Sequence, residues 1–252
     1  MKKLTAPILS ATLALAILSV ASSTLAQDPP PLLSVYTEHV KLGHNADYET
    51  TVKELWAAMK KAGADFPVTA SQSVSRPGDY TFVSPLSNMA DMDHQNEAFG
   101  KAFAAMGSLM ADFGKHSNGN ESTVIAPRPD LSYGPASPRV APADAGFARV
   151  MFLHPHPEHA MELEAAIKEF GELSKKKGIT DGFGVYTPTI GEGPVYAIRT
   201  VAKSEADFYA QQAKNEATMG AEGQALRERV GPMLQKIEYA AGVPRPDLSY
   251  QP

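Results

Sequence analysis

Residues 35–63, VYTEHVKLGHNADYETTVKELWAAMKKAG, return 115 residues later as residues 150–178, VMFLHPHPEHAMELEAAIKEFGELSKKKG. Nine of the 29 aligned positions are identical, among them the histidine pairs His39/His154 and His44/His159. The heptapeptide PRPDLSY also occurs twice, at residues 127–133 and 244–250. Because these matches keep their order while the offset drifts only from 115 to 117, the chain is an internal duplication whose copies should share one fold.

The duplicated stretch predicts a strand followed by an amphipathic helix. Residues 32–40 are rich in Val, Tyr and Thr, which favour strands, and their second copy, residues 147–153, is almost continuously apolar. Tyr48, Val52, Leu55 and Met59 then fall at helical spacing, and a glycine, Gly63 in the first copy, follows the helix.

Each copy continues with a predicted hairpin, a second helix and a last strand. The hairpin strands are expected at residues 69–76 and 79–85 in the first copy and at 182–190 and 194–201 in the second. The second helix carries a wide apolar face from Met92 to Phe113 in the first copy, and in the second it breaks near Gly220. The last strands, residues 121–126 and 234–240, lead into PRPDLSY, which we expect to strap across a unit and bury Leu131 or Leu248.

The order strand, helix, strand, strand, helix, strand is that of the ferredoxin-like α+β motif. One such unit covers one face of its sheet with helices and leaves the other face in need of a partner, which a tandem copy supplies. The chain thus resembles the dimeric α/β-barrel superfamily, which includes antibiotic-biosynthesis-type monooxygenases, NIPSNAP-like proteins and haem-degrading or chlorite-dismutating proteins. The resemblance implies a pseudo-dimeric barrel within one chain, with a ligand cavity between two facing sheets.

The predicted domain organisation starts with a signal peptide. Lys2 and Lys3 precede an apolar run at residues 8–20 and a small-residue cleavage site before Gln27, as in Sec-type signals. The predicted boundaries are residues 1–26 for the signal peptide, 27–31 for a leader, 32–133 for repeat 1, 134–146 for a Pro/Ala-rich linker and 147–252 for repeat 2. We therefore expect a periplasmic or secreted protein without a membrane span after cleavage.

Composition excludes several function classes. The chain has no cysteine, so it can form neither a disulfide nor a thiolate metal site. Without Lys2 and Lys3, 21 basic residues face 28 acidic ones, and a net negative protein without a basic patch is not expected to bind nucleic acid. The expected partner is a small-molecule ligand, and the expected assembly is a monomer or a weak homo-oligomer.

Six residues are candidates for the site. His39 and His154 each close the first strand of a copy, where a neutral imidazole could act as a general base, although it could equally bond a neighbouring backbone group. Tyr36, Tyr80 and Tyr196 could donate hydrogen bonds to a ligand in an apolar cavity or simply pack at strand ends. The resemblance to haem-handling proteins implies an iron-ligating histidine on a helix, for which His94 is the candidate, against the alternative of a solvated helix histidine.

No cofactor and no metal site are predicted. The run HPHPEH at residues 154–159 has a composition that zinc or copper could accept, but its prolines keep the backbone extended, so its side chains need not converge. Phosphate loops, dinucleotide fingerprints and nucleophile elbows are missing from the sequence.

Two functional hypotheses follow. The first is an exported protein that binds a small apolar or aromatic molecule in the cavity between the sheets. The second is a cofactor-independent monooxygenase acting on a hydroxylated aromatic substrate, in which His39 or His154 would remove the phenolic proton; a haem-binding relative is a further alternative.

Overall fold

The structure, a computed structural model, describes residues 30–107, 109–189 and 194–252. The predicted signal peptide, most of the leader and the turn of the second hairpin lie outside these residues. Repeat 1 consists of β1 (Leu32–Val40), α1 (Asn45–Lys61), β2 (Thr69–Ser73), β3 (Asp79–Leu86), α2 (Asp91–Met106), α3 (Leu109–His116) and β4 (Ser117–Pro127). Repeat 2 consists of β5 (Phe147–Pro155), α4 (Ala160–Lys176), β6 (Gly184–Pro188), β7 (Tyr196–Ala202), α5 (Glu205–Val230) and β8 (Leu234–Pro244).

The eight strands form one closed barrel in the order β1-β3-β2-β8-β5-β7-β6-β4, and every neighbouring pair is antiparallel. The two repeats meet at two edges, where Ser71 of β2 pairs with Pro244 of β8 and Ile125 of β4 pairs with Pro188 of β6. Each repeat thus caps the sheet edges of the other, which removes the unpaired edges that a lone four-stranded sheet exposes. The predicted α+β pseudo-dimeric barrel is confirmed.

The inner face of the barrel holds an apolar cluster to which both repeats contribute. Successive strand residues point to opposite faces, so Leu33 and Val35 of β1 face inward while Tyr36 faces outward. The buried members of this barrel cluster are Leu33, Val35, Val83, Ile125, Val150, Phe152, Val195, Ala197 and Ala240. The two sheets therefore turn their helix-free faces toward one another, as expected.

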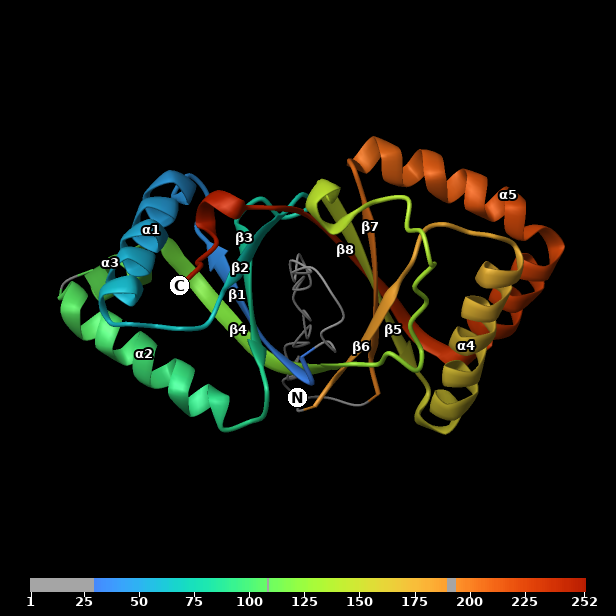
Figure 1. Cartoon of the computed structure of the whole chain (residues 1–252), viewed down its shortest axis with the longest axis horizontal. Helices are drawn as coiled ribbons and strands as arrows, with labels where there is room; N and C mark the ends of the chain where they lie inside the picture. Colours follow the sequence, from blue (N-terminus) through green and yellow to red (C-terminus); the bar gives the residue numbers. More distant parts are fainter. Residues whose placement is uncertain (1–29, 108, 190–193) are drawn as a thin grey trace, which may run out of the picture.

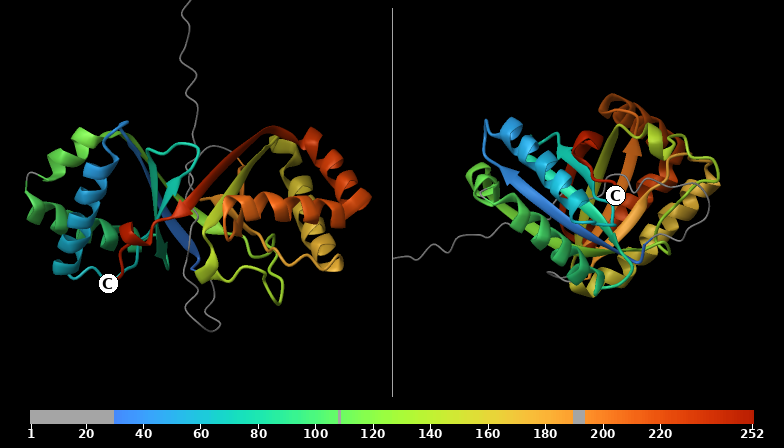
Figure 2. Two further views of the ribbon diagram at one scale, coloured as in Figure 1. Left: turned by 90° about the horizontal axis from the view of Figure 1, so that it is seen from above. Right: turned by 60° about the vertical axis from the view of Figure 1, so that its left-hand side comes forward.

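The helices cover the outside of the barrel. Figure 1 shows α1, α2 and α3 over the sheet of repeat 1 and α4 and α5 over that of repeat 2, and Figure 2 shows the two helical layers at opposite ends of the molecule. The stripe predicted for the first helix is buried in α1, where Met59 is fully buried and Tyr48 and Val52 are each 1% exposed. Hydrophobic burial on this outer face thus holds α1 to the sheet.

The PRPDLSY tails cross between the repeats. The C-terminal tail leaves β8 of repeat 2 and ends beside α1 of repeat 1, as Figure 1 shows. There Trp56 donates its indole N–H to the carbonyl of Leu248 at 2.7 Å, and Leu248 is fully buried. The first tail packs likewise on repeat 2, with Leu131 1% exposed in a cluster with Leu163 of α4. Each tail buries its leucine as predicted, but in the opposite repeat.

Two expectations about the elements need correction. The second helix of repeat 1 is not continuous, because Gly107 takes φ 59° and separates α2 from α3. The last strands are longer than predicted, since β4 and β8 each run for 11 residues. Within the predicted linker, residues 134–146, Val140 is buried and Arg139 forms ion pairs with Asp181 and Asp207.

The predicted break in α5 is confirmed at Gly220, which has φ 56° and ψ −144°. Within the described ranges, the structure has no helix that is both long enough and apolar enough to span a membrane.

Candidate functional site

A pocket of about 510 Å³ lies on the outer face of the repeat 2 sheet, under α4 and α5. Its walls are mainly apolar and come from β5, β7, α4 and α5; they include Met151, Leu163, Ile167, Phe170, Ile198, Met219 and Leu226. A concave apolar site of this size suits a small organic molecule. This pocket lies outside the barrel wall of repeat 2 and not between the two sheets, where the sequence predicted a ligand cavity and where the barrel cluster lies.

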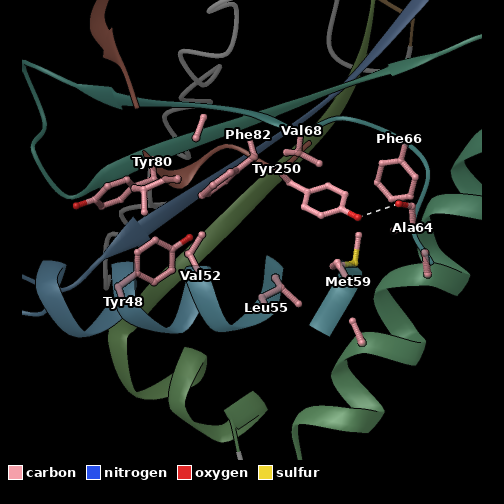
Figure 3. Close-up of a cluster of buried hydrophobic side chains, with 14 of the residues drawn as sticks. Tyr48, Val52, Leu55, Met59, Ala64, Phe66, Val68, Tyr80, Phe82 and Tyr250 are labelled. Carbon is pink, nitrogen blue, oxygen red and sulfur yellow. Dashed lines mark hydrogen bonds between the residues drawn. The ribbon is translucent and has the colours of Figure 1, made fainter. Parts of the chain in front are cut away.

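Five large side chains that fill this space in repeat 1 are replaced by smaller ones in repeat 2. The filling side chains Tyr36, Met59, Phe66, Phe82 and Phe99 correspond in repeat 2 to Met151, Ser174, Asp181, Ile198 and Asn215, all of which line the pocket. Equivalent contacts support this alignment, since the hydroxyl of Tyr250 donates to the carbonyl of Ala64 and that of Tyr133 donates to the carbonyl of Ile179. Figure 3 shows the filled counterpart in repeat 1, where Tyr250 lies between Phe82 and the pair Met59 and Phe66.

A polar network closes one end of the pocket. Asp181, whose side chain is 8% exposed, accepts hydrogen bonds from Arg139 at 2.9 Å and from Asn215 at 2.9 Å. Arg139 also reaches Asp207 at 2.8 Å. These charges satisfy one another, so this wall is rigid and its polar atoms are already paired.

A second cation stands in the pocket wall among aromatic rings. The guanidinium of Arg149 lies 4.2 Å from the ring centre of Tyr239, 5.4 Å from that of Phe208 and 5.9 Å from that of Tyr209. Such rings hold a cation in place without neutralising it. Arg149 can therefore still offer its N–H groups to an oxygen of a bound molecule.

The two candidate catalytic histidines lie at the same end of the barrel. Four antiparallel steps separate β1 from β5, so both strands run in the same direction and their ends share one rim. His39 Nδ1 is 2.8 Å from an oxygen of Asp79, and His154 Nε2 is 2.9 Å from an oxygen of Glu238, although the latter contact lacks hydrogen-bond geometry. Both rings point inward, on the opposite face of the sheet from the pocket, so neither can contact a molecule bound there.

Tyr80 and Tyr196 belong to the tail contacts rather than to the pocket. The hydroxyl of Tyr80 donates to Glu49 at 2.7 Å, and Glu49 is also held by Arg245 of the C-terminal tail. Burial, together with the bond to Glu49, raises the pKa of Tyr80 to about 12. Tyr196 makes the equivalent bond to Glu164 at 2.9 Å.

Tyr36 and His94 also lie away from the pocket. The hydroxyl of Tyr36 donates to Glu38 at 2.5 Å within repeat 1, and burial raises its pKa. His94 is exposed on α2 and pairs with Asp65 at 2.8 Å, a bond that raises the pKa of the imidazole. The predicted ligand-binding residues are therefore not gathered around one cavity.

The pocket lacks the iron-ligating histidine that the resemblance to haem-handling proteins implies. Among the residues that line the pocket there is no histidine, the position equivalent to His94 is Ala210, and the chain has no cysteine. Neither imidazole nor thiolate is available there as an axial iron ligand.

The HPHPEH run does not form a metal cluster. The ring of His154 points into the barrel toward Glu238, whereas His159 pairs with Glu162 in the first turn of α4. In the described part of the chain, ligand atoms converge elsewhere, at His44, Asp47 and His116.

Sequence reasoning missed the pocket residues and one buried charge. The signal for the pocket was available in the aligned copies, as positions where Phe or Met in one becomes Ser, Asp or Asn in the other. Arg199 points into the barrel, burial lowers its pKa, and its Nε has no hydrogen-bond partner among protein atoms. Comparison of the two copies did not single out Arg199, because the equivalent position in repeat 1 is Val83 and not an arginine.

The closed barrel, the outer helices and the duplication define a pseudo-dimeric α/β-barrel protein, the class that the sequence predicted. A candidate monooxygenase from Lactobacillus acidophilus NCFM has a similar structure, with TM-score 0.55 and 10% identity over 88% of this chain and 96% of that one. An anthrone oxidase-like protein has TM-score 0.56 and 11% identity over 85% and 91% of the two chains. A chlorite dismutase variant from Candidatus Nitrospira defluvii has TM-score 0.53 and 12% identity over 88% and 94%.

These likenesses establish the fold. No protein-family model and no curated protein sequence matches the chain.

Proposed function

We propose that this protein is an exported binding protein that holds a small apolar or aromatic molecule in the pocket of repeat 2. The observation that carries the proposal is the difference between the repeats: the space that Phe82 and Phe99 fill in repeat 1 is open beside Ile198 and Asn215 in repeat 2. An unfilled apolar space costs packing energy, so an empty pocket of this size needs a ligand or another reason to exist.

The lining limits the chemistry of the ligand. The aromatic or branched apolar part of a ligand would fill the space that side chains fill in repeat 1. Arg149 would donate a hydrogen bond to an anionic or hydroxyl oxygen of that ligand. Because the Arg139–Asp181–Asn215 network is already satisfied, it would contribute shape rather than new hydrogen bonds.

Binding can be tested with 1-anilinonaphthalene-8-sulfonate, an aromatic probe that carries one sulfonate. We expect its fluorescence to rise on saturable binding of one equivalent to the folded mature protein. Asn215→Phe and Ile198→Phe, which introduce the residues of repeat 1, should weaken binding at least tenfold by filling the pocket. Ala217→Phe is the matched control, because it adds the same ring to an exposed position on the same helix.

Equal binding by the filled variants and by Ala217→Phe would overturn the proposal. The natural ligand can be sought by native mass spectrometry of protein purified from its own host, where a bound mass should be lost in Asn215→Phe. Competition between the co-purified molecule and the fluorescent probe then shows whether both bind at one site.

The alternative of a cofactor-independent monooxygenase has weaker support. It would need a base at the bound substrate, whereas His39 and His154 are paired with carboxylates on the inner face of the barrel. Oxygen uptake with hydroxylated aromatics that is abolished in a folded His39→Ala, His154→Ala double variant would favour the enzyme over the binding protein.

Export and assembly complete the proposal. The N-terminal sequence favours export, and the mature protein should begin at Gln27 in a periplasmic or culture fraction. Closure of the barrel within one chain leaves no strand edge that a second copy must cover, so light scattering should report a monomer.

A further inference from the structure

Three metal-binding side chains converge in repeat 1, outside the pocket. His44 precedes α1, Asp47 lies in the first turn of that helix, and His116 ends α3. The Nδ1 atoms of His44 and His116 are 3.0 Å apart, and a carboxylate oxygen of Asp47 lies within 4.8 Å of one ring nitrogen of each histidine. Residues 72 positions apart thus bring two imidazoles and a carboxylate to one point.

The spacing suits a metal ion. Zinc binds imidazole nitrogen at about 2.0–2.1 Å, so two nitrogens on one tetrahedral ion lie about 3.4 Å apart. The observed 3.0 Å requires the rings to separate by only a few tenths of an ångström. Without an ion, the same two nitrogens can share a single proton. Among the described residues no ion pair holds the side chain of Asp47, so an ion would use all three groups.

The backbone fixes both histidines. The amide of Lys41 donates to the carbonyl of His116 at 2.8 Å, and the amide of His44 donates to the carbonyl of Lys41 at 3.0 Å. Gly43 allows this tight loop, because its φ of 82° is one that other residues rarely adopt. The rings are therefore brought together by the fold rather than by a chance side-chain rotation.

Repeat 2 contains the same arrangement without its third ligand. The amide of His156 donates to the carbonyl of Met233 at 2.8 Å, which makes Met233 the counterpart of His116. His159 and Glu162 stand where His44 and Asp47 stand in repeat 1, and they bond each other at 2.6 Å. A thioether is a poor ligand for zinc, so the duplication supplies an internal control.

We propose that His44, Asp47 and His116 bind one divalent transition-metal ion of zinc-like preference, with its remaining positions open to water. Two imidazoles and one carboxylate match zinc better than calcium or magnesium, which prefer all-oxygen sites. The ion would join the start of α1 to the end of α3, the helix that follows the break after α2 at Gly107. Its expected effect is to stabilise repeat 1 by binding only the folded state.

The test uses the mature protein without a histidine tag, stripped with a chelator and titrated with zinc chloride in a calorimeter. We expect one equivalent to bind and the thermal transition to rise. Cobalt(II) should give visible ligand-field bands typical of nitrogen and oxygen ligands. His116→Met, which installs the residue of repeat 2, should weaken zinc binding at least tenfold, abolish the cobalt bands and leave the transition unchanged by zinc.

His159→Ala is the matched control and should bind zinc like the unaltered protein. A metal-free His116→Met protein with an unchanged thermal transition shows that the variant folds. The proposal is overturned if the unaltered protein binds zinc no more tightly than His116→Met does. It is also overturned if His159→Ala weakens zinc binding as much as His116→Met. Neither outcome bears on the pocket of repeat 2, since none of the three ligands lines it.

Discussion

Arg245 and Glu49, 196 residues apart, face each other in a two-pronged ion pair whose nitrogen–oxygen distances are both 2.7 Å. The pair joins the tail of repeat 2 to α1 of repeat 1. Arg128 and Glu164 form the equivalent pair in the other direction, at 2.8 and 3.1 Å. The same contact is therefore present twice. In each case an arginine of PRPDLSY pairs with a repeated glutamate, which also accepts a hydrogen bond from a repeated tyrosine.

We expect Arg245→Met to destabilise the protein by about 2 kcal/mol, because it leaves the carboxylate of Glu49 without its charged partner in a largely shielded site. Arg229→Met is the matched control. Arg229 pairs with Glu169 at a site where both side chains are about half exposed, so its loss should cost roughly 0.5 kcal/mol or less. Urea unfolding measures both values, and equal losses would remove the structural role from the tail pair.

Acid should weaken the same contacts. The bonds from Arg245 lower the pKa of Glu49 below its ordinary 4.5, and those from Arg128 lower the pKa of Glu164. A carboxyl group whose pKa is lowered in the folded state stabilises it above the unfolded pKa, and this contribution is lost as the pH falls through the folded pKa. We therefore expect the free energy of unfolding to fall below pH 4.5.

Glu49→Gln provides the check on this pH dependence, because an amide does not titrate. The variant should be less stable at pH 7 and should lose less stability than the unaltered protein between pH 5 and pH 3. An identical decline in both proteins would place the acid sensitivity elsewhere.

The fold was largely predictable, because the sequence patterns that indicate its helices and strands are local and occur in both copies. The apolar stripe of α1, the glycines after the helices and the order of elements all follow from periodicity within each copy. The crossing of the tails was not predictable. Because PRPDLSY is identical in both copies, Leu248 could pack as well in its own repeat as in the other, and only the closed barrel brings it to Trp56.

The pocket of repeat 2 was not predicted from the sequence, for a physical reason. Identity between the copies marks what both halves need to fold, and Tyr80 and Tyr196 are identical because both hold a tail. The pocket arises where the copies differ, as at Met59 and Ser174. In a duplicated chain, the aligned positions that lose volume thus indicate a cavity better than those that repeat.

A side chain at Gly220 should strain the backbone. Its φ of 56° and ψ of −144° lie in a region that is almost restricted to glycine, so Gly220→Ala should cost about 1–3 kcal/mol. Gly231→Ala is the control, because Gly231 has helical angles of −48° and −51° and open space around it. That variant should change stability by less than about 1 kcal/mol. Thermal unfolding of both distinguishes backbone strain from a general intolerance of change near α5.

The unequal packing of the two repeats predicts unequal costs for equivalent truncations. Phe82 is 7% exposed and surrounded by aromatic rings, so Phe82→Ala should cost about 3–5 kcal/mol. Its counterpart Ile198 borders the open pocket and has fewer atoms to lose contact with, so Ile198→Ala should cost about 2 kcal/mol or less. Chemical denaturation gives both values, and saturation with the bound molecule should raise the cost of Ile198→Ala while leaving that of Phe82→Ala unchanged. If Ile198→Ala costs as much as Phe82→Ala in the ligand-free protein, the space beside Ile198 is packed and repeat 2 has no pocket to fill.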